Sequence, residues 1–153
     1  MRGFLTLVCA AAGVAGLSAC GPSGSIDESG AVFDAIAPDE TITLTGTEPF
    51  WGLEIRSTPQ GGHEARFSEP GDGDGRVFEA ARFAGNNGLG FSGELAGRPV
   101  QIAITPGECS DAMSDRTYPF VATVAWGETT LLGCAYTDAA PYSPLSSTST
   151  RAP

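Results

Sequence analysis

The chain has 153 residues, an apolar content of 41% and a net charge of −10 at neutral pH. This length fits one domain of ordinary size, and the apolar content is sufficient for a folded core. All 8 basic residues are arginines. Nucleic acids and anionic membrane surfaces are bound by clustered positive charge, so this composition argues against both as partners.

The N-terminus has the pattern of a secretory signal. Met1-Arg2 supplies a positive start, and the uncharged apolar run over 3–16 is shorter than the roughly 20 residues that span a bilayer. The run ends in Leu17-Ser18-Ala19-Cys20-Gly21, which resembles the bacterial lipobox. The resemblance implies that Cys20 is lipidated and becomes the first residue of the mature chain. The alternative is an ordinary cleaved signal, in which Cys20 is a spare thiol.

Lipidation would hold the protein on a membrane through several acyl chains. The next residue, Gly21, is not the aspartate that retains enteric lipoproteins in the inner membrane. By that resemblance we expect an outer-membrane, periplasm-facing location. Loss of Arg2 with the signal leaves the mature chain at −11, one unit below the −10 of the full chain.

The composition after the signal predicts a folded domain between two poorly ordered segments. Gly, Ser and Pro dominate the stretch after Cys20, which is typical of a flexible spacer, and the C-terminal residues contain few core-forming side chains. We expect a signal peptide over 1–19, a lipidated cysteine and tether over 20–39, a β-domain over 40–138 and a disordered tail over 139–153.

Apolar residues alternate with polar ones through the predicted domain, as they do in half-buried strands. In chain order, strands are expected around 42–44, 51–55, 63–67, 76–83, 89–95, 100–104, 120–126 and 130–136, with Gly- and Pro-rich turns between them. The best helix candidate, 29–36, is short and lies in the tether. We therefore expect an all-β fold, a small antiparallel β-barrel or sandwich of about eight strands.

The cysteines predict one disulfide. Cys9 lies in the cleaved segment and Cys20 in the lipobox, which leaves Cys109 and Cys134 in an oxidising compartment. Their disulfide would close a loop of about 25 residues. A redox-active pair is the weaker alternative because the chain has no C-x-x-C motif.

Three segments stand out from the strand-and-turn pattern. They are Gly46-Thr47-Glu48-Pro49-Phe50-Trp51, the segment from Cys109 to Pro119, and Leu132-Gly133-Cys134-Ala135. In this order after a signal peptide, they resemble a family of uncharacterised bacterial envelope proteins, often predicted to be lipoproteins. Members of this family carry G-[TN]-E-P-F-W, C-x-D-x-M-S-D-x-x-Y-P and a closing Gly-Cys pair. The resemblance implies a location and a fold but no mechanism.

These segments contain the candidate binding residues, which are Glu48, Trp51, Asp111, Asp115, Arg116 and Tyr118. The first segment either fills the core with its aromatic residues or presents an aromatic-and-acid patch to a ligand. In the second, Asp111, Ser114 and Asp115 order an irregular turn, or the loop recognises a partner. Under the structural interpretation, Arg116 would pair with Asp111 or Glu48.

The sequence indicates no metal site, no cofactor and no catalytic group. The Gly71–Gly75 run lacks the further acids of a calcium loop, and His63 is the single histidine. Nucleophile-elbow and phosphate-loop motifs are absent. Scattered carboxylates such as Glu48, Glu54 and Asp111 could form an acid pair, but acids are plentiful in this chain. A pocket in which Glu48, Asp111 and Asp115 converge would favour an enzyme.

Our leading hypothesis is a non-catalytic envelope lipoprotein that binds an envelope protein or a small ligand. The alternative is an inhibitor of a basic hydrolase such as lysozyme, toward which an acidic domain would be steered. Burial of Trp51, Tyr118 and Trp126 would favour a partner-binding surface, and an open cavity would favour a small ligand. The sequence leaves the oligomeric state open.

Overall fold

A computed structural model describes residues 32–144. The strands are β1 Ile42–Thr47, β2 Phe50–Ser57, β3 His63–Ser68, β4 Arg76–Ala84, β5 Leu89–Leu95, β6 Arg98–Cys109, β7 Arg116–Trp126, β8 Thr129–Thr137 and the short β9 Ser143–Pro144. No helix occurs in this part of the chain, and consequently none there is long and apolar enough to cross a membrane. Cys9, Cys20, the signal and most of the expected tether lie outside the described residues.

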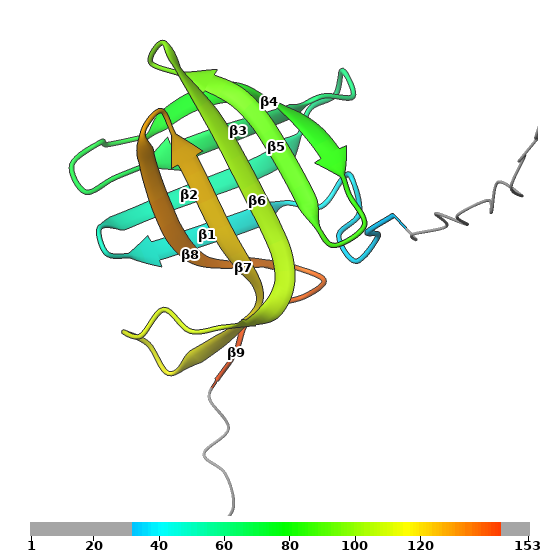
Figure 1. The fold of residues 1–153 in the computed structure, drawn as a ribbon, viewed down its shortest axis with the longest axis vertical. Coiled ribbons are helices and arrows are strands. Elements are labelled where there is room, and N and C mark those ends of the chain that lie inside the picture. Colours follow the sequence, from blue (N-terminus) through cyan, green and yellow to red (C-terminus); the bar gives the residue numbers. More distant parts are fainter. Residues whose placement is uncertain (1–31, 145–153) are drawn as a thin grey trace, which may run out of the picture.

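The sheet closes on itself (Figure 1). Each of β1 to β7 pairs antiparallel with the strand that follows it, and β8 returns to pair with β1. The predicted all-β fold is confirmed, and of the two expected architectures it is the barrel. The turn between β5 and β6 is short. Leu95 pairs with Arg98, so the turn is Ala96–Gly97, both with positive φ, and Arg98 and Pro99 belong to β6.

The barrel interior is filled by the inward-facing residues of the alternating strands. Fully buried side chains include Phe67, Leu44, Ile55, Ile104 and Val124. Trp51, Tyr118 and Trp126 are also buried, at 4%, 2% and 9% exposure. Burial of these three aromatic residues favours a partner-binding surface over an open cavity.

Both ends of the barrel are closed. At one end Ile36, from the segment before β1, is completely buried, and Arg82 donates a hydrogen bond to its carbonyl oxygen. At the other end the guanidinium of Arg98 lies 3.7 Å from the ring centroid of Trp126, and that of Arg76 lies 4.8 Å from it. Arginine stacking shields the tryptophan from water while the charge stays solvated.

The folded unit extends beyond the expected limits of 40–138. Phe33 and Ile36 pack against the core on the N-terminal side, although the sequence placed them in a flexible tether. On the C-terminal side Ala140 packs against the core and β9 pairs with β7. The composition of these segments resembles that of linkers, but a few apolar side chains are enough to dock each one on the barrel.

Candidate functional site

The three sequence motifs meet at one groove on the outer surface of the barrel. This motif groove has a volume of about 500 Å³, and it is lined by Thr45, Gly46, Thr47, Glu48, Cys109, Ser110, Asp111, Ala112, Val121, Thr130, Leu132, Gly133 and Cys134. Barrel closure places β1 beside β8, with Thr45 opposite Cys134. Segments about 90 residues apart in the chain are therefore neighbours in the groove.

The predicted disulfide between Cys109 and Cys134 is confirmed, with a Cα–Cα distance of 5.5 Å. It joins the end of β6, where this strand continues beyond the barrel, to the middle of β8. The register between β6 and β7 shifts between Pro106 and Cys109, so the hairpin bends at this point. The disulfide thereby fixes the bent hairpin tip at the edge of the motif groove.

Two motif glycines make room for the Trp51 side chain. A Cβ atom on Gly46 would lie 2.0 Å from the indole nitrogen of Trp51, and a Cβ atom on Gly133 would lie 2.8 Å from its ring. The indole therefore fills space on the inner side of β1 and β8 that other residues would occupy. It also stacks on Phe67, with ring centroids 6.3 Å apart. Trp51 serves the core, which agrees with the structural interpretation of the first motif.

Asp111 organises the loop between β6 and β7. Its Oδ1 accepts hydrogen bonds from the backbone nitrogens of Met113 and Ser114 at 3.1 and 2.8 Å. Its Oδ2 accepts from the Tyr118 hydroxyl at 3.0 Å, and the Ser114 hydroxyl reaches both oxygens. The backbone carbonyl of Asp111 accepts from the Thr47 hydroxyl at 3.0 Å. The second motif is thereby tied to the first.

These hydrogen bonds change the acidity of Asp111. Together they lower the pKa of Asp111 from 3.8 to about 2. The backbone N–H of Ser114 has the largest effect, and the Ser114 hydroxyl, the Met113 N–H and the Tyr118 hydroxyl add to it. Burial of the carboxylate opposes them and raises the pKa, but by less. The carboxylate is therefore ionised at neutral pH, and both of its oxygens are occupied. A general acid needs a pKa near the working pH, so Asp111 is not suited to that role.

Asp111→Ala is expected to lower the free energy of unfolding by about 2 kcal/mol at neutral pH, because several hydrogen bonds to a charged group are lost, including the one from the buried Tyr118 hydroxyl. The folded pKa lies below the unfolded value, so this stabilisation is present above 3.8 and disappears as the pH falls from 3.8 toward 2. Urea unfolding at several pH values measures both effects.

Asp115→Ala is the matched control for this prediction. Asp115 lies in the same loop but is exposed. Its replacement is expected to change the stability little at any pH. Equal losses for the two variants at neutral pH would contradict the assigned role of Asp111.

Arg116 and Tyr118 contact aromatic side chains that the sequence analysis did not assign to them. Arg116 forms no salt bridge with Asp111 or Glu48 among the described residues. Its guanidinium lies 4.3 Å from the ring centroid of Tyr142, in a segment expected to be disordered, and the Tyr118 side chain and the charge of Asp111 raise its pKa. Tyr118 packs in a cluster with Tyr142 and Tyr136, at centroid distances of 5.6 and 5.9 Å. The expected ion pair of Arg116 is therefore replaced by stacking on an aromatic ring, a partner that the sequence alone did not reveal.

Glu48 is the one predicted acid that remains exposed at the groove with its side chain available. It occupies the turn between β1 and β2 and lines the groove together with Asp111. Asp115 is exposed but does not line the groove. The three acids therefore do not converge into a catalytic set.

Sequence reasoning missed the apolar part of the groove. Leu132 of β8 is 66% exposed and Val121 of β7 is 37% exposed, and both line the groove. The alternation around Leu131, which is buried, already placed Leu132 on the outer face, where an apolar residue is unexpected. An apolar residue at an outward position of the strand was therefore the sequence feature that could have revealed this part of the groove.

The segments weighed as metal sites have local structural roles. Asp72 accepts hydrogen bonds from the backbone of Glu69 and from Arg76, and the His63 ring nitrogen lies 2.9 Å from the carbonyl oxygen of Pro38. Within residues 32–144, no group of at least three histidine, cysteine or acidic side chains could hold a metal ion.

No protein-family model matches the chain, and comparison with curated proteins and with solved structures found no match. The function must therefore be argued from the groove and from the chemistry of its residues.

Proposed function

We propose that this protein is a non-catalytic envelope lipoprotein, held by acylated Cys20 on the periplasmic side of the outer membrane, that binds an envelope partner or a small ligand in the motif groove. The observation that carries the proposal is the convergence of all three motifs on this groove. The resemblance of these motifs to those of envelope proteins supports the location.

The filled barrel supports a surface site. Because Trp51, Tyr118 and Trp126 are buried and both barrel ends are closed, a ligand has no access to the interior. The motif groove is open to solvent and combines exposed Leu132 with threonine hydroxyls and the carboxylate of Glu48. Such a lining suits an apolar group that lies beside a hydrogen-bond donor or a cation. A short segment of an envelope protein has this chemistry.

The state of the acids supports a binding role. The carboxylate oxygens of Asp111 are saturated by hydrogen bonds, and Asp115 lies outside the groove lining. Glu48 is then the single groove acid with its side chain available, whereas acid–base hydrolysis of glycosides uses two such carboxyl groups.

Cys20→Ala is expected to move the protein from the membrane fraction to the soluble periplasmic fraction, since the domain has no charge attraction to an anionic surface. Fractionation of cells that carry the natural or variant chain measures this. Unchanged membrane association of the variant would contradict lipid anchoring, but it would leave the groove proposal standing.

A photo-crosslinking residue at position 132 is expected to capture the partner in intact cells. The matched control is the same residue at position 77, because Val77 is also an exposed apolar residue of an outer barrel face, at 44% exposure, but lies on β4 away from the groove. In a chain with the probe at Thr130, Leu132→Asp should abolish the adduct, since a carboxylate would then enter the apolar part of the groove. Equal adducts at positions 132 and 77 would overturn the groove assignment.

A second candidate is inhibition of a basic hydrolase, and the distribution of acids favours it. Glu64 and Glu79 face each other across β3 and β4, and both are exposed. Like charges in this register are unfavourable in the free protein and would be relieved by a cationic partner. A lysozyme lysis assay tests this candidate: inhibition that is lost in Glu79→Ala but kept in Leu132→Asp would favour it over the groove proposal.

A further inference from the structure

The motif groove lies where β1 and β8 stop pairing. The register between the two strands ends at the pair Thr45–Cys134. β8 begins earlier, at Thr129, and among the described residues its segment 129–133 pairs with β7 alone (Figure 1). This segment, which we call the free edge of β8, therefore has one side without a neighbouring strand. It supplies Thr130, Leu132 and Gly133 to the lining of the groove.

The indole of Trp51 lies at the point where the pairing ends. The next pair in the register would be Gly46 and Gly133, and the ring occupies the space that side chains at these two positions would take. Its nitrogen is buried and has no hydrogen-bond partner among the described residues. A buried donor without a partner lowers stability. A hydrogen-bond acceptor that entered the groove beside Gly46 would supply the missing partner.

The free edge of β8 has the chemistry that accepts another strand. Alternate residues of a strand direct their N–H and C=O groups to opposite sides. The Leu132 carbonyl oxygen lies on the β1 side, 2.8 Å from the position of a Cβ atom on Gly46, so by alternation the backbone groups of Thr130 face the same side. The segment 129–133 also contains no charged residue and no proline, which commonly protect exposed edges.

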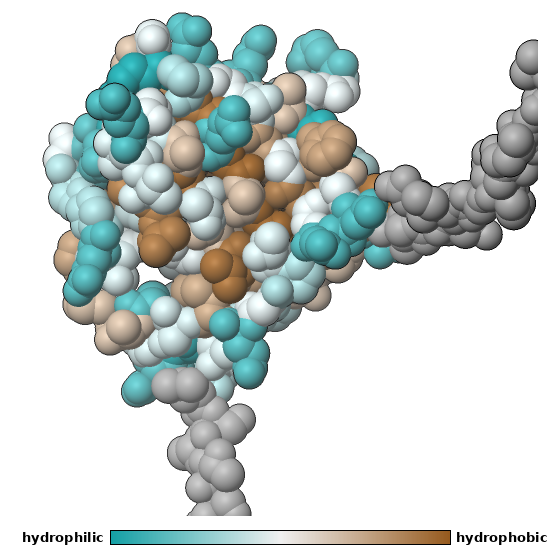
Figure 2. Space-filling view, viewed as in Figure 1, coloured by the Kyte–Doolittle hydropathy of each residue, from teal (hydrophilic) through white to brown (hydrophobic). Residues whose placement is uncertain are grey.

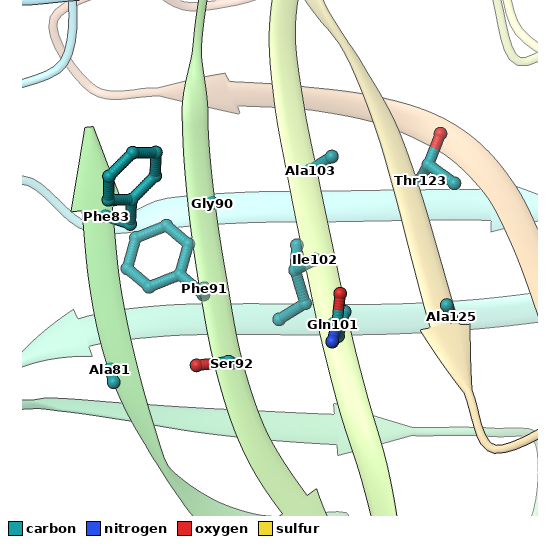
Figure 3. A pocket seen from close by; sticks show the side chains of 10 residues that line it. All are labelled: Ala81, Phe83, Gly90, Phe91, Ser92, Gln101, Ile102, Ala103, Thr123 and Ala125. Atoms are coloured by element: carbon teal, nitrogen blue, oxygen red, sulfur yellow. The ribbon is translucent and has the colours of Figure 1, made fainter. Parts of the chain in front are cut away.

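The other large hollow of the barrel surface presents side chains only. It has a volume of about 440 Å³ and lies outside β4 to β7, on the face that Figure 2 shows with apolar and weakly polar residues over its middle. Its lining residues come from four neighbouring strands (Figure 3), which pair with one another along the hollow. The backbone groups there are used within the sheet. A free edge is therefore what distinguishes the motif groove.

The charge of the motif groove selects among extended segments. Its lining contains the carboxylates of Glu48 and Asp111 and no basic residue. Glu48 is exposed, and the low pKa of Asp111 keeps its side chain ionised at neutral pH. In a chain with a net charge of −10, this lining favours a segment that carries lysine or arginine.

We propose that the motif groove binds an extended, basic peptide segment of the partner, which pairs with the free edge of β8 as an additional short strand. This inference rests on the proposed function, in which the groove is the binding site, and it adds the mode of binding and the chemistry of the segment. Main-chain hydrogen bonds to Thr130 supply affinity, and alternate side chains of the segment reach Leu132 and Glu48. The free edge accommodates about five residues, the length of an ordinary short strand.

Short peptides selected from a random library on the full chain in detergent provide the probe. We expect the selected peptides to combine apolar residues with lysine or arginine. Thr130→Pro removes the N–H that faces the gap, and should weaken binding of a selected peptide by about tenfold or more. Thr130→Val keeps this N–H and the size of the side chain, and should change binding by less than about twofold. Near-ultraviolet circular dichroism, which reports on the buried tryptophans, verifies that each variant is folded.

Charge is tested by a second pair of variants. Glu48→Gln should weaken binding of the same peptide and reduce its dependence on salt, because an ion pair with the peptide is lost. Glu94→Gln, at an exposed position of β5 that does not line the groove, should leave both unchanged. Equal effects of the two substitutions would overturn the assigned role of Glu48 and the preference for a basic segment.

Methylation of the peptide nitrogens tests strand pairing without any change in the protein. Methyl groups on alternate nitrogens should abolish binding, and those on the intervening nitrogens should be tolerated. A peptide that tolerates methylation at every position, or that binds folded Thr130→Pro like the natural chain, would overturn strand addition. A library without a binder at high micromolar concentration would overturn it as well. The proposed function itself fails on a different result, equal crosslinking at positions 132 and 77.

Discussion

Replacing Cys109 and Cys134 together by alanine is expected to lower the free energy of unfolding by about 3.5 kcal/mol. The two residues are 25 positions apart, and the estimate is the chain entropy that a crosslink of this span removes from the unfolded state. Cys134 is 1% exposed, so its loss also leaves a small gap in the packing. Urea unfolding of the natural and the doubly substituted chain, both folded beforehand, measures the difference.

The disulfide also determines the geometry of the motif groove, which gives the prediction a second readout. Without it, the bent end of β6 and the loop around Asp111 are held by hydrogen bonds alone, such as that from Thr47. Amide hydrogen exchange should therefore accelerate in 110–115 more than in the barrel strands. Reduction of the natural chain should reproduce both effects. An unchanged stability after reduction would show that the crosslink does not hold the hairpin.

Gly133→Ala is expected to destabilise the protein by about 3 kcal/mol, the upper part of the range for overpacked cores. The added methyl group would lie 2.2 Å from the backbone oxygen of Thr45 and 2.8 Å from the Trp51 ring. The Thr45 oxygen belongs to the β1 backbone and cannot turn aside, so β1 and β8 would have to separate. The intrinsic fluorescence should shift to longer wavelength as the indole gains contact with water.

Gly52→Ala is the matched control, since Gly52 is also a strand glycine but faces outward. A methyl group there would meet the Ser68 hydroxyl oxygen at 3.1 Å, and that side chain can rotate. We expect a change of less than about 1 kcal/mol, because a surface substitution with a movable neighbour is well tolerated. A similar loss in both variants would mean that the effect of Gly133→Ala comes from strand propensity and not from Trp51.

The strands could be predicted from the sequence because each one alternates. Trp51, Leu53 and Ile55 on β2 are buried while Glu54 is not, and the same period runs through β6 and β7. The packing of the segment before β1 against the barrel could not be predicted, because Ile36 lies in a stretch where apolar and polar residues do not alternate. A single apolar residue in a polar context gives no periodic signal, and its burial depends on the open barrel end that it closes.

The candidate site was predicted in part. The three motif segments line one groove, and the roles of Trp51 and Asp111 as core and loop-ordering residues were among the stated alternatives. The apolar contribution of Leu132 was missed, as was the stacking of Arg116 on Tyr142. Both depend on which side chains meet across strands, and the pattern along one strand does not contain that information.

The sequence by itself determined the all-β class, the positions of the eight barrel strands along the chain and the Cys109–Cys134 disulfide, because alternation is local and the expected β-domain contains two cysteines, which have a single way to pair. The tertiary structure decided that the sheet closes by pairing β1 with β8. That closure fills the interior and brings three distant motifs to one groove. Barrel closure depends on the twist and tilt of the whole sheet. No short stretch of residues predicts it, because it involves strands that are far apart in the sequence.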